Sequence, residues 1–336
     1  MTSLQEIWAR LDGTAAAVGL RPAYPPVALD LEQRVVSLVR CKPRRGRKAL
    51  LEAHVQRRLD DPVLPDSIFQ PAGKTTPDLV DRLRELFEAG GTRPGRVSLV
   101  LPDNLAKISI LQLPERPASQ RELDELVRSK MRRAVPFRLD DVMISYQVVP
   151  GTGSAVGVLV VLVHRAVVER LESTFEAFGA RAGLIDLATP NLINLVRARI
   201  DRLGADGGDV ALVNCAERYF SLVITRDGQV IFYRCKTFAA SADGTPTPNG
   251  SLSREVAHSF AYYREKLGGE GIGAVLLRST SLPNEEVVRH LAGLECERIE
   301  PIRLEHNIEL ADGVQLDNDA AQRLAPAIGA AIARGG

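Results

Sequence analysis

The sequence has 336 residues, and its 43 lysines and arginines nearly balance its 42 aspartates and glutamates, giving a formal net charge of +1 at pH 7. Hydrophobic residues make up 45% and charged residues 25%, a composition typical of globular proteins that excludes a disordered chain. The balanced charge argues against nucleic-acid binding, because neutralising phosphates needs an excess of basic residues. At roughly 150 residues per domain, the length favours two domains.

No membrane span or secretion signal is expected. The uncharged apolar runs are short, such as the nine residues Ala155–Val163, whereas a membrane helix needs about 20. The first residues lack the basic segment and apolar core of a signal peptide. The four cysteines, Cys41, Cys215, Cys235 and Cys296, show no recurrent spacing, which predicts reduced thiols rather than a zinc or disulfide framework.

The first regular elements are expected after residue 26, because the residues before it end in a cluster of prolines and predict a tail or linker. We then expect strands at Val27–Asp30 and Arg34–Arg40. The basic stretch Lys42–Lys48 predicts a solvated loop, with contact to anionic lipid headgroups as the alternative. A helix is expected between Pro77 and Gly90, since proline favours the first helical position and glycine the end.

The middle of the chain is expected to contain both strands and helices. Ser119 and Glu122 form a capping box, which predicts the start of a helix that Pro136 ends. The other expected elements are strands at Arg96–Leu101 and Lys107–Leu113, a hairpin of Val142–Val149 and Val156–Val163, and helices over Ala166–Phe178 and Pro190–Leu203.

The Gly- and Asp-rich segment Ala205–Asp209 predicts a hinge between two halves. After the hinge, Asp227 and Gly228 form an Asp-Gly pair, which is a strong signal for a β-hairpin. Expected in this part are strands at Asp209–Asn214, Arg218–Ile224, Gln229–Arg234 and Ala274–Leu277, a loop at Ser241–Ser251, and helices over Val256–Leu267, Asn284–Leu291 and Ala320–Ala333.

One strand–turn–strand pattern occurs twice. Val27–Val39 and Val210–Val223 share it, and an arginine stands just before the second strand of each, Arg34 and Arg218. The two copies start 210 − 27 = 183 residues apart. A chance match of short apolar strings is one explanation. A duplication is the other, and it predicts that each half begins with a β-hairpin.

No catalytic or metal-binding motif stands out from the residues alone. Gly73-Lys74-Thr75 resembles the end of a phosphate-binding loop, but position 68, where that loop needs glycine, is Ile68. The five histidines form no HxxxH or HExxH pair, which argues against zinc. No GxSxG sequence marks a nucleophilic serine.

A series of short motifs occurs in a distinctive order. They are the strand ending at Leu101-Pro102, the segment Ile110–Pro114, a helix with Glu122, Leu123 and Arg128, the turn Val135-Pro136-Phe137, Asp140-Asp141 before a strand, and the closing segment Ala325–Ala331. This order, over the chain from residue 27 onward, resembles the PilM family of type IV pilus assembly proteins, which are cytoplasmic relatives of FtsA and actin. The resemblance also explains the repeat, because actin-like proteins consist of two related halves around a cleft.

The resemblance implies an α/β fold with mixed sheets, namely an actin-like ATPase fold of two related RNase H-like halves. After an N-terminal tail of residues 1–26, the first half would span 27–205 and the second half 206–336. A small αβ subdomain, at about 107–175, would be inserted in the first half.

The hairpins that meet the nucleotide depart from the family pattern. Each half of an actin-like ATPase offers an Asp-x-Gly hairpin to the phosphates, where glycine lets backbone N–H groups approach and aspartate holds Mg²⁺ through water. Here Asp30 is kept but Glu32 stands in place of the glycine. In the second hairpin, Asn214 and Ala216 replace the aspartate and the glycine.

The turn that meets adenosine in the family falls at Arg278-Ser279-Thr280, after the expected strand Ala274–Leu277. The resemblance therefore implies a remnant site, with Ser279 as its nucleoside-side residue, no catalytic residue and no metal ligand. No cofactor is expected, or ATP with magnesium if the remnant still works.

The resemblance also implies a partner. In the family, a groove between the core of the first half and the insertion holds the N-terminal cytoplasmic tail of a bitopic inner-membrane pilus protein. An extended tail can bind through backbone hydrogen bonds, with alternate side chains in pockets. The expected partner-binding residues are Ile110, Leu111, Leu113, Pro136 and Phe137, and Phe137 is either a core residue or an anchor that lines the groove.

Two main classes of function follow from the resemblance, and a third function is kept beside them. One is a non-catalytic cytoplasmic scaffold of a type IV pilus or related secretion machine, peripheral at the inner membrane. The other is an active actin-like ATPase with unusual nucleotide loops. A third is the actin-like cytoplasmic component of a type II secretion system, which would continue into a membrane helix that is not expected here. The altered loops favour the scaffold, and self-association is left open.

Overall fold

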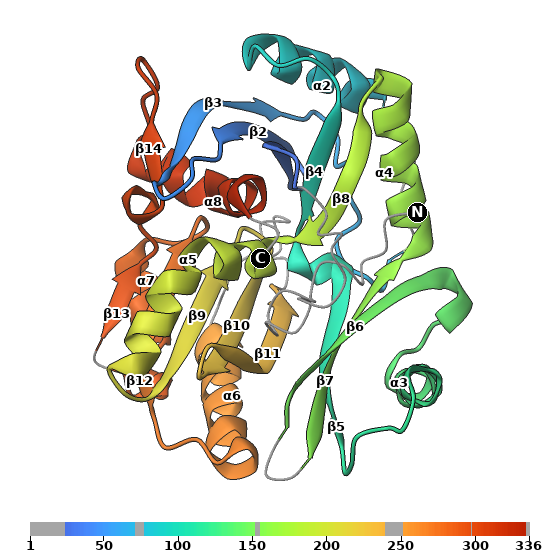
Figure 1. Cartoon of the computed structure of the whole chain (residues 1–336), viewed down its shortest axis with the longest axis vertical. Coiled ribbons are helices and arrows are strands. Elements are labelled where there is room, and N and C mark those ends of the chain that lie inside the picture. Colours follow the sequence, from blue (N-terminus) through green and yellow to red (C-terminus); the bar gives the residue numbers. More distant parts are fainter. Residues whose placement is uncertain (1–23, 71–76, 152–154, 239–250, 297, 334–336) are drawn as a thin grey trace.

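The computed structural model describes residues 24–70, 77–151, 155–238, 251–296 and 298–333. These ranges form three β-sheets with flanking helices, and Figure 1 shows one sheet at the top, one at the lower left and one at the lower right. Most of the expected N-terminal tail, Gly73-Lys74-Thr75 and nearly all of the expected loop Ser241–Ser251 lie outside the described residues.

The first sheet has the strand order β14-β3-β2-β1-β4-β8. Its strands are β1 (Val27–Leu31), β2 (Val35–Lys42), β3 (Ala49–Arg58), β4 (Arg96–Leu101), β8 (Arg181–Leu187) and β14 (Ile308–Leu310). β1, β2 and β3 form an antiparallel meander, whereas β4 is parallel to β1 and β8 is parallel to β4. All five residues of β1 are buried, which is why its sequence is nearly continuously apolar rather than alternating.

The second sheet has the order β11-β10-β9-β12-β13. Its strands are β9 (Asp209–Cys215), β10 (Tyr219–Arg226), β11 (Gln229–Thr237), β12 (Ile272–Ser279) and β13 (Ile299–Pro301). An antiparallel meander is again followed by two parallel strands beside its first strand, so β11-β10-β9-β12-β13 repeats the topology of β3-β2-β1-β4-β8. A duplication predicts this identity of topology. Asp227 and Gly228 have positive φ angles of 51° and 72°, as a two-residue hairpin turn requires.

The third sheet has the order β5-β7-β6 and is antiparallel throughout. Its strands are β5 (Ala106–Leu113), β6 (Val142–Pro150) and β7 (Val156–His164), and α3 (Gln120–Ala134) accompanies them. Leu123, Val127 and Met131, spaced four residues apart, form the buried face of α3 and join one apolar cluster with β5, β6 and β7. Ser119 caps this helix by accepting the backbone N–H of Glu122 at 3.2 Å, as the capping box predicts. The unit lies in the range expected for the inserted subdomain.

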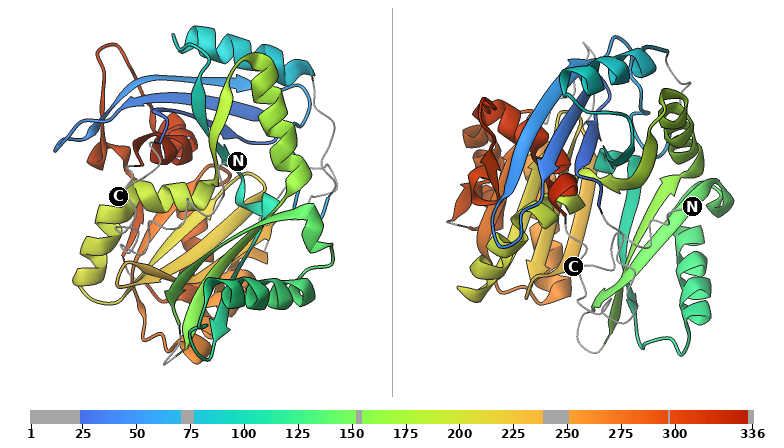
Figure 2. Two further views of the ribbon diagram at one scale, coloured as in Figure 1. Left: turned by 45° about the vertical axis from the view of Figure 1, so that its right-hand side comes forward. Right: turned by 45° about the horizontal axis from the view of Figure 1, so that its top comes forward.

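The remaining helices are α2 (Pro77–Ala89), α4 (Arg165–Phe178), α5 (Ala188–Ala205), α6 (Ser251–Leu267), α7 (Asn284–His290) and α8 (Asn318–Ile332). α5 and α8 pack against each other between the first and second sheets, as Figures 1 and 2 show. A Cβ atom on Gly329 of α8 would lie 2.0 Å from the carbonyl oxygen of Asn191 of α5, so only glycine permits this close crossing. α2 and α4 pack against the first sheet, and α6 and α7 pack against the second.

Four strands have no counterpart among the expected elements: β3, β8, β13 and β14. β13 and β14 have three residues each, too few to show a period of two in the sequence. β14 pairs with β3, and α8 packs on β1 and β2, so the end of the chain returns to the core of the first half. The division into residues 27–205 and 206–336 stays a prediction, and this return is the feature that it leaves out.

Candidate functional site

The turns of the two hairpins line one pocket, which has a volume of about 470 Å³. Glu32–Arg34 come from the β1–β2 turn, and Ala216–Tyr219 come from the β9–β10 turn and the start of β10. The pocket is also lined by Arg58, Pro65, Pro102, Asn104, Thr280 and Ser281. Each half thus contributes its own hairpin to a shared cleft.

A buried arginine links the two hairpins. Arg278 lies on β12, opposite Asn214 of β9 in the parallel ladder, and only 1% of its surface is exposed. Its Nη1 donates to Asn214 Oδ1 at 2.8 Å, and its Nη2 lies 3.8 Å from Glu32 Oε1. A single side chain of the second half therefore contacts the polar groups of both hairpins.

Arg278 also holds α8, through a carbonyl group that the helix leaves free. The Nε of Arg278 donates to the carbonyl oxygen of Gln322 at 2.8 Å. That oxygen would normally accept the N–H four residues later, but residue 326 is Pro326, which has none. Arg278 Nη2 donates to the next carbonyl, that of Arg323, at 3.4 Å. Pro326 thus leaves the carbonyl of Gln322 free to accept a hydrogen bond from the buried guanidinium.

The amide of Asn214 extends this network into the first half. Its Nδ2 donates to Thr189 Oγ1 at 2.9 Å, and the Thr189 hydroxyl donates in turn to Asp103. Asp103 also accepts the backbone N–H of Thr189 at 3.0 Å and the Ser221 hydroxyl at 2.6 Å. Because Asp103 follows β4, Thr189 begins α5 and Ser221 lies on β10, these bonds connect both sheets through buried side chains.

Three carboxyl groups in this cluster have raised pKa values. Burial raises the pKa of Asp30 well above its usual value, and the nearby Glu32 raises it further, while Arg278 lowers it. Burial also raises the pKa of Glu32 against the opposing effect of Arg278. Burial raises the pKa of Asp103 although hydroxyl groups donate to it. The cleft therefore disfavours additional negative charge, such as that of phosphate groups.

Four of the five residues expected at the remnant nucleotide site come together. Asp30 and Glu32 lie at the end of the first hairpin, and Asn214 and Ala216 lie at the end of the second. Ser279 differs from the expectation, which places it in a turn after Leu277. The ladder with β9 continues through Ser279, so Ser279 is a strand residue, and its hydroxyl donates to the carbonyl of Leu282 at 2.6 Å.

Asp103 and Thr189 are absent from the residues singled out by sequence, and Arg278 is named there only as part of the turn expected to meet adenosine, not as a cation between the hairpins. A signal for Arg278 does exist, because Pro326 inside a helical pattern predicts a free carbonyl that needs a donor. Asp103 follows directly on Leu101-Pro102, but nothing in the sequence connects it to Thr189, which is 86 residues away.

The residues expected to bind a partner divide between the two faces of β5. Ile110 packs against the large core between the sheets, whereas Leu111 and Leu113 pack against the cluster under α3. Pro136 is exposed, and Phe137 is half-buried. Because successive side chains of a strand point to opposite faces of the sheet, a peptide lying on one face cannot contact both Ile110 and Leu111. A peptide running along the edge of the sheet could contact both, and β5 is an edge strand.

Phe137 belongs to a small aromatic group. Its ring centroid lies 4.9 Å from that of His164 and 6.2 Å from that of Phe69, which is 62% exposed. The ring is thus neither fully buried nor isolated on the surface, which keeps both interpretations of Phe137 open.

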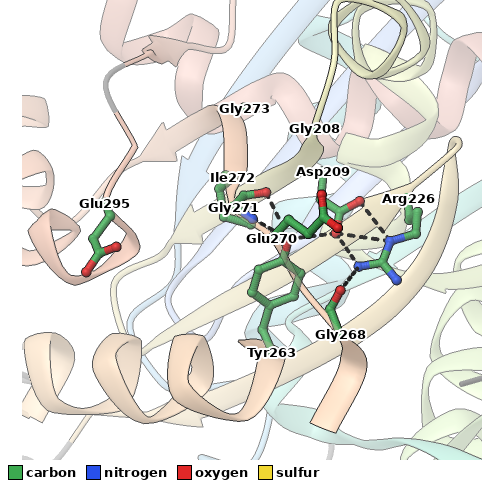
Figure 3. A pocket seen from close by; sticks show the side chains of 10 residues that line it. All are labelled: Gly208, Asp209, Arg226, Tyr263, Gly268, Glu270, Gly271, Ile272, Gly273 and Glu295. Atoms are coloured by element: carbon green, nitrogen blue, oxygen red, sulfur yellow. Dashed lines mark hydrogen bonds and ion pairs between the residues drawn. The ribbon is translucent and has the colours of Figure 1, made fainter. Parts of the chain in front are cut away.

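A second pocket, of about 590 Å³, lies at the far end of the second sheet (Figure 3). Figure 3 shows Arg226 and Tyr263 turned toward Asp209, among several glycines. Arg226 Nη2 donates to Asp209 Oδ2 at 2.7 Å, and its Nη1 donates to the carbonyl of Leu267 at 3.1 Å. The Tyr263 hydroxyl lies 2.7 Å from Asp209 Oδ2. These groups satisfy one another and fasten the end of α6 to the start of β9, so we assign this pocket a structural role.

The described ranges contain neither a cluster of metal ligands nor a membrane-spanning helix. No group of three or more histidine, cysteine, aspartate or glutamate side chains is arranged there to hold a metal ion. None of the described helices combines the length and hydrophobicity that crossing a bilayer requires.

Comparisons with known proteins agree with this fold. No curated protein matches the sequence. Among solved structures, a type IV pilus biogenesis complex of PilM and PilN superposes with a TM-score of 0.70, at 17% identity, over 94% of this chain and 98% of that chain. The cytoplasmic domain of EpsL, an inner-membrane component of the type II secretion system of Vibrio cholerae, gives a TM-score of 0.49 at 11% identity, over 84% of this chain and 91% of that one.

The sequence itself also matches a protein family. Residues 28–242, which include both hairpins and the third sheet, match the family described as type IV pilus assembly protein PilM. This chain therefore belongs to the PilM family of type IV pilus assembly proteins, and its fold is actin-like.

Proposed function

We propose that this protein is a non-catalytic scaffold of a type IV pilus machine, in which the two hairpins of the nucleotide cleft are linked by the protein's own side chains. The observation that carries the proposal is Arg278, which is buried and bonded to Asn214 and α8 while facing Glu32. In our proposal this guanidinium replaces Mg²⁺ as the positive charge between the hairpins. The two halves then stay together without a nucleotide.

The replacements in the hairpins support the same conclusion. A phosphate about 4 Å from the Glu32 carboxylate would meet a repulsion of roughly 1–4 kcal/mol at effective dielectric constants of 80 to 20. Asn214 has no charge with which to hold Mg²⁺, and its amide is already used by Arg278 and Thr189. Ala216 adds a methyl group where the family has glycine.

Calorimetry with Mg·ATP tests the loss of nucleotide binding. We expect no heat of binding up to millimolar nucleotide and no release of phosphate above the background. A dissociation constant in the low micromolar range would overturn the scaffold proposal and favour an active ATPase.

One observation supports that second candidate. Arg34, Arg58 and Arg218 line the open pocket, although Glu32 and Glu217 line it too. If ATP binds, we expect its phosphates near these arginines rather than between the hairpins. Arg218→Ala would then weaken binding, whereas under the scaffold proposal it changes no nucleotide signal.

We further propose that the scaffold holds the N-terminal cytoplasmic tail of a bitopic inner-membrane protein, which would keep it in the cytoplasm at the membrane. The similar PilM structure is a complex with PilN. In this chain β5 is an edge strand of the third sheet, and such an edge can accept an extended peptide as an added strand. Phe137, whose ring contacts His164 at the end of the middle strand β7, is our candidate for the anchor.

The test uses Phe137→Ala and a peptide with the N-terminal segment of the same organism's PilN. Because the ring is half-buried, we expect the variant to stay folded, with peptide affinity lowered by about 2 kcal/mol. A loss of about 3–5 kcal/mol in stability would instead identify Phe137 as a core residue. Unchanged peptide affinity in a stably folded variant would remove Phe137 from the site.

A further inference from the structure

The C-terminal half of α3 carries an unusual concentration of positive charge. Arg128, Lys130, Arg132 and Arg133 are exposed there, and Arg138 follows in the next turn. We call these five residues the α3 basic face. No aspartate or glutamate occurs between the first and the last of them, although the chain as a whole is almost neutral.

The positive charges of this face are largely left to solvent. Among the residues that the structure describes, Lys130, Arg132 and Arg133 make no ion pair and no side-chain hydrogen bond. Arg138 is paired only with Asp140, at 3.5 Å, and both of these side chains are exposed. The opposite side of the helix is fixed by its apolar contacts with the third sheet, so the basic side faces outward.

An exposed aromatic ring lies near the end of this face, against the residue that precedes Arg138. Phe69 is 62% exposed, and its ring is tilted against that of Phe137, with the two centroids 6.2 Å apart; Phe137 comes one residue before Arg138. Cations beside an exposed apolar ring fit the boundary between the headgroups and acyl chains of a bilayer, where the ring enters and the charges pair with phosphate.

We propose that the α3 basic face and Phe69 form a contact surface for the anionic lipids of the membrane. This inference rests on the proposed function, in which the tail of a membrane protein holds the scaffold at the bilayer. The tail and the lipid surface would then act together, because tail binding raises the effective concentration of the basic face at the membrane. Phe137 lies beside both, since it is our candidate anchor for the tail and the neighbour of Phe69.

The other basic segment of the chain is a suitable control. The β2–β3 hairpin, at Lys42–Lys48, also carries five basic residues. Two of them are engaged, because Arg44 pairs with Glu309 at 2.6 Å and Lys48 donates to the carbonyl of Glu305 at 2.6 Å. The hairpin tip lies on the opposite side of the molecule from α3 in Figures 1 and 2. The two surfaces cannot meet one flat membrane together.

The experiment compares two triple variants of the full chain that remove the same charges. One is Lys130→Gln/Arg132→Gln/Arg133→Gln on α3, and the other is Lys42→Gln/Arg45→Gln/Arg47→Gln on the hairpin. Each is measured by co-sedimentation with vesicles of phosphatidylglycerol and phosphatidylethanolamine, and with neutral phosphatidylcholine vesicles. Both sets of side chains are exposed, so melting temperatures should match that of the wild type.

We expect the wild type to bind the anionic vesicles, weakly at high salt, and to bind the neutral vesicles little. The α3 variant should lose at least about tenfold in affinity, and the hairpin variant less than about twofold. Phe69→Ser should lose a few-fold. Equal losses in the two triple variants, or no binding by the wild type, would overturn the proposal. Salt-sensitive binding to an acidic protein without any vesicle binding would assign the face to a protein partner instead.

Titration with the PilN tail peptide separates this proposal from the one on which it rests. We expect the α3 variant to keep its affinity for the peptide while it loses vesicle binding. If the wild type does not bind the peptide but still binds anionic vesicles through α3, the tail proposal fails and the lipid surface stands.

Discussion

The two hairpins of the cleft share one backbone pattern and differ in charge. The first ends in two carboxyl groups, Asp30 and Glu32, whereas the second offers the neutral Asn214 and Ala216. In a working actin-like site both hairpins would face the same anion and metal. Here the first hairpin keeps negative charge, and the second half supplies one buried cation, Arg278, to meet it. In our proposal, the two hairpins are therefore linked to each other by Arg278 rather than by a ligand.

The largest expected effect comes from removing that cation. Arg278→Met should lower the free energy of unfolding by about 3–5 kcal/mol, because it leaves buried carboxyl groups without their positive partner and a carbonyl of α8 without its donor. Urea unfolding measures the loss. The matched control is Arg323→Met, whose side chain is more exposed and pairs with Glu217 at 3.4 Å, and it should cost less than about 1 kcal/mol.

Adding Glu32→Gln to Arg278→Met should restore part of the lost stability, since one of the unpaired carboxyl groups is then neutral. If Arg278→Met lowers the free energy of unfolding no more than the control does, the guanidinium does not hold the two hairpins together. Arg278 would then not explain why the two hairpins differ in charge.

A smaller effect is expected on the second hairpin. Asn214→Ala removes the acceptor for Arg278 and the donor to Thr189, so it should cost about 1–3 kcal/mol of unfolding free energy. Thermal and urea unfolding both measure it. A cost below about 0.3 kcal/mol would show that water or rearranged side chains replace the amide without loss.

On the first hairpin, we expect a dependence of stability on pH. The folded chain raises the pKa of Asp30, so it binds this proton more tightly than the unfolded chain does. Its contribution to stability is present below the unfolded pKa and is lost as the pH rises through the raised folded pKa. Asp30→Asn should flatten this part of the profile, as measured by urea unfolding across a series of pH values.

The sequence predicts the hairpins and their charges better than what lies between them. Each hairpin can be predicted because its two strands and its turn lie within one short stretch of the sequence. The sequence places Arg278 in a turn and misses its role between the hairpins, because β12 extends past the expected strand end at Leu277 and two of its acceptors come from α8. Asp103 and Thr189 meet only because β4 and α5 fold side by side, and no local pattern encodes that meeting.

The return of the chain end to the first half is hidden for the same reason. β14 is three residues long, and its pairing with β3 joins segments more than 250 residues apart. Pro326 is the one local sign of what α8 does, because a proline inside a helix frees the carbonyl four residues earlier. A proline within a helical pattern therefore indicates a free carbonyl group that a buried arginine can donate to.

The smallest expected effect is on nucleotide binding when the family pattern is restored. In the triple variant Glu32→Gly/Asn214→Asp/Ala216→Gly, both hairpins again read Asp-x-Gly, yet we expect calorimetry with Mg·ATP to stay silent. The reason is Arg278, which donates to the side chain at position 214 at 2.8 Å and would pair more strongly with a carboxylate there. A metal ion would have to displace that buried guanidinium before it could use the new aspartate. Adding Arg278→Ser to the triple variant removes the competitor, and binding that appears only then identifies the arginine as the obstacle. Binding in the triple variant alone would show instead that the hairpin residues were the whole difference.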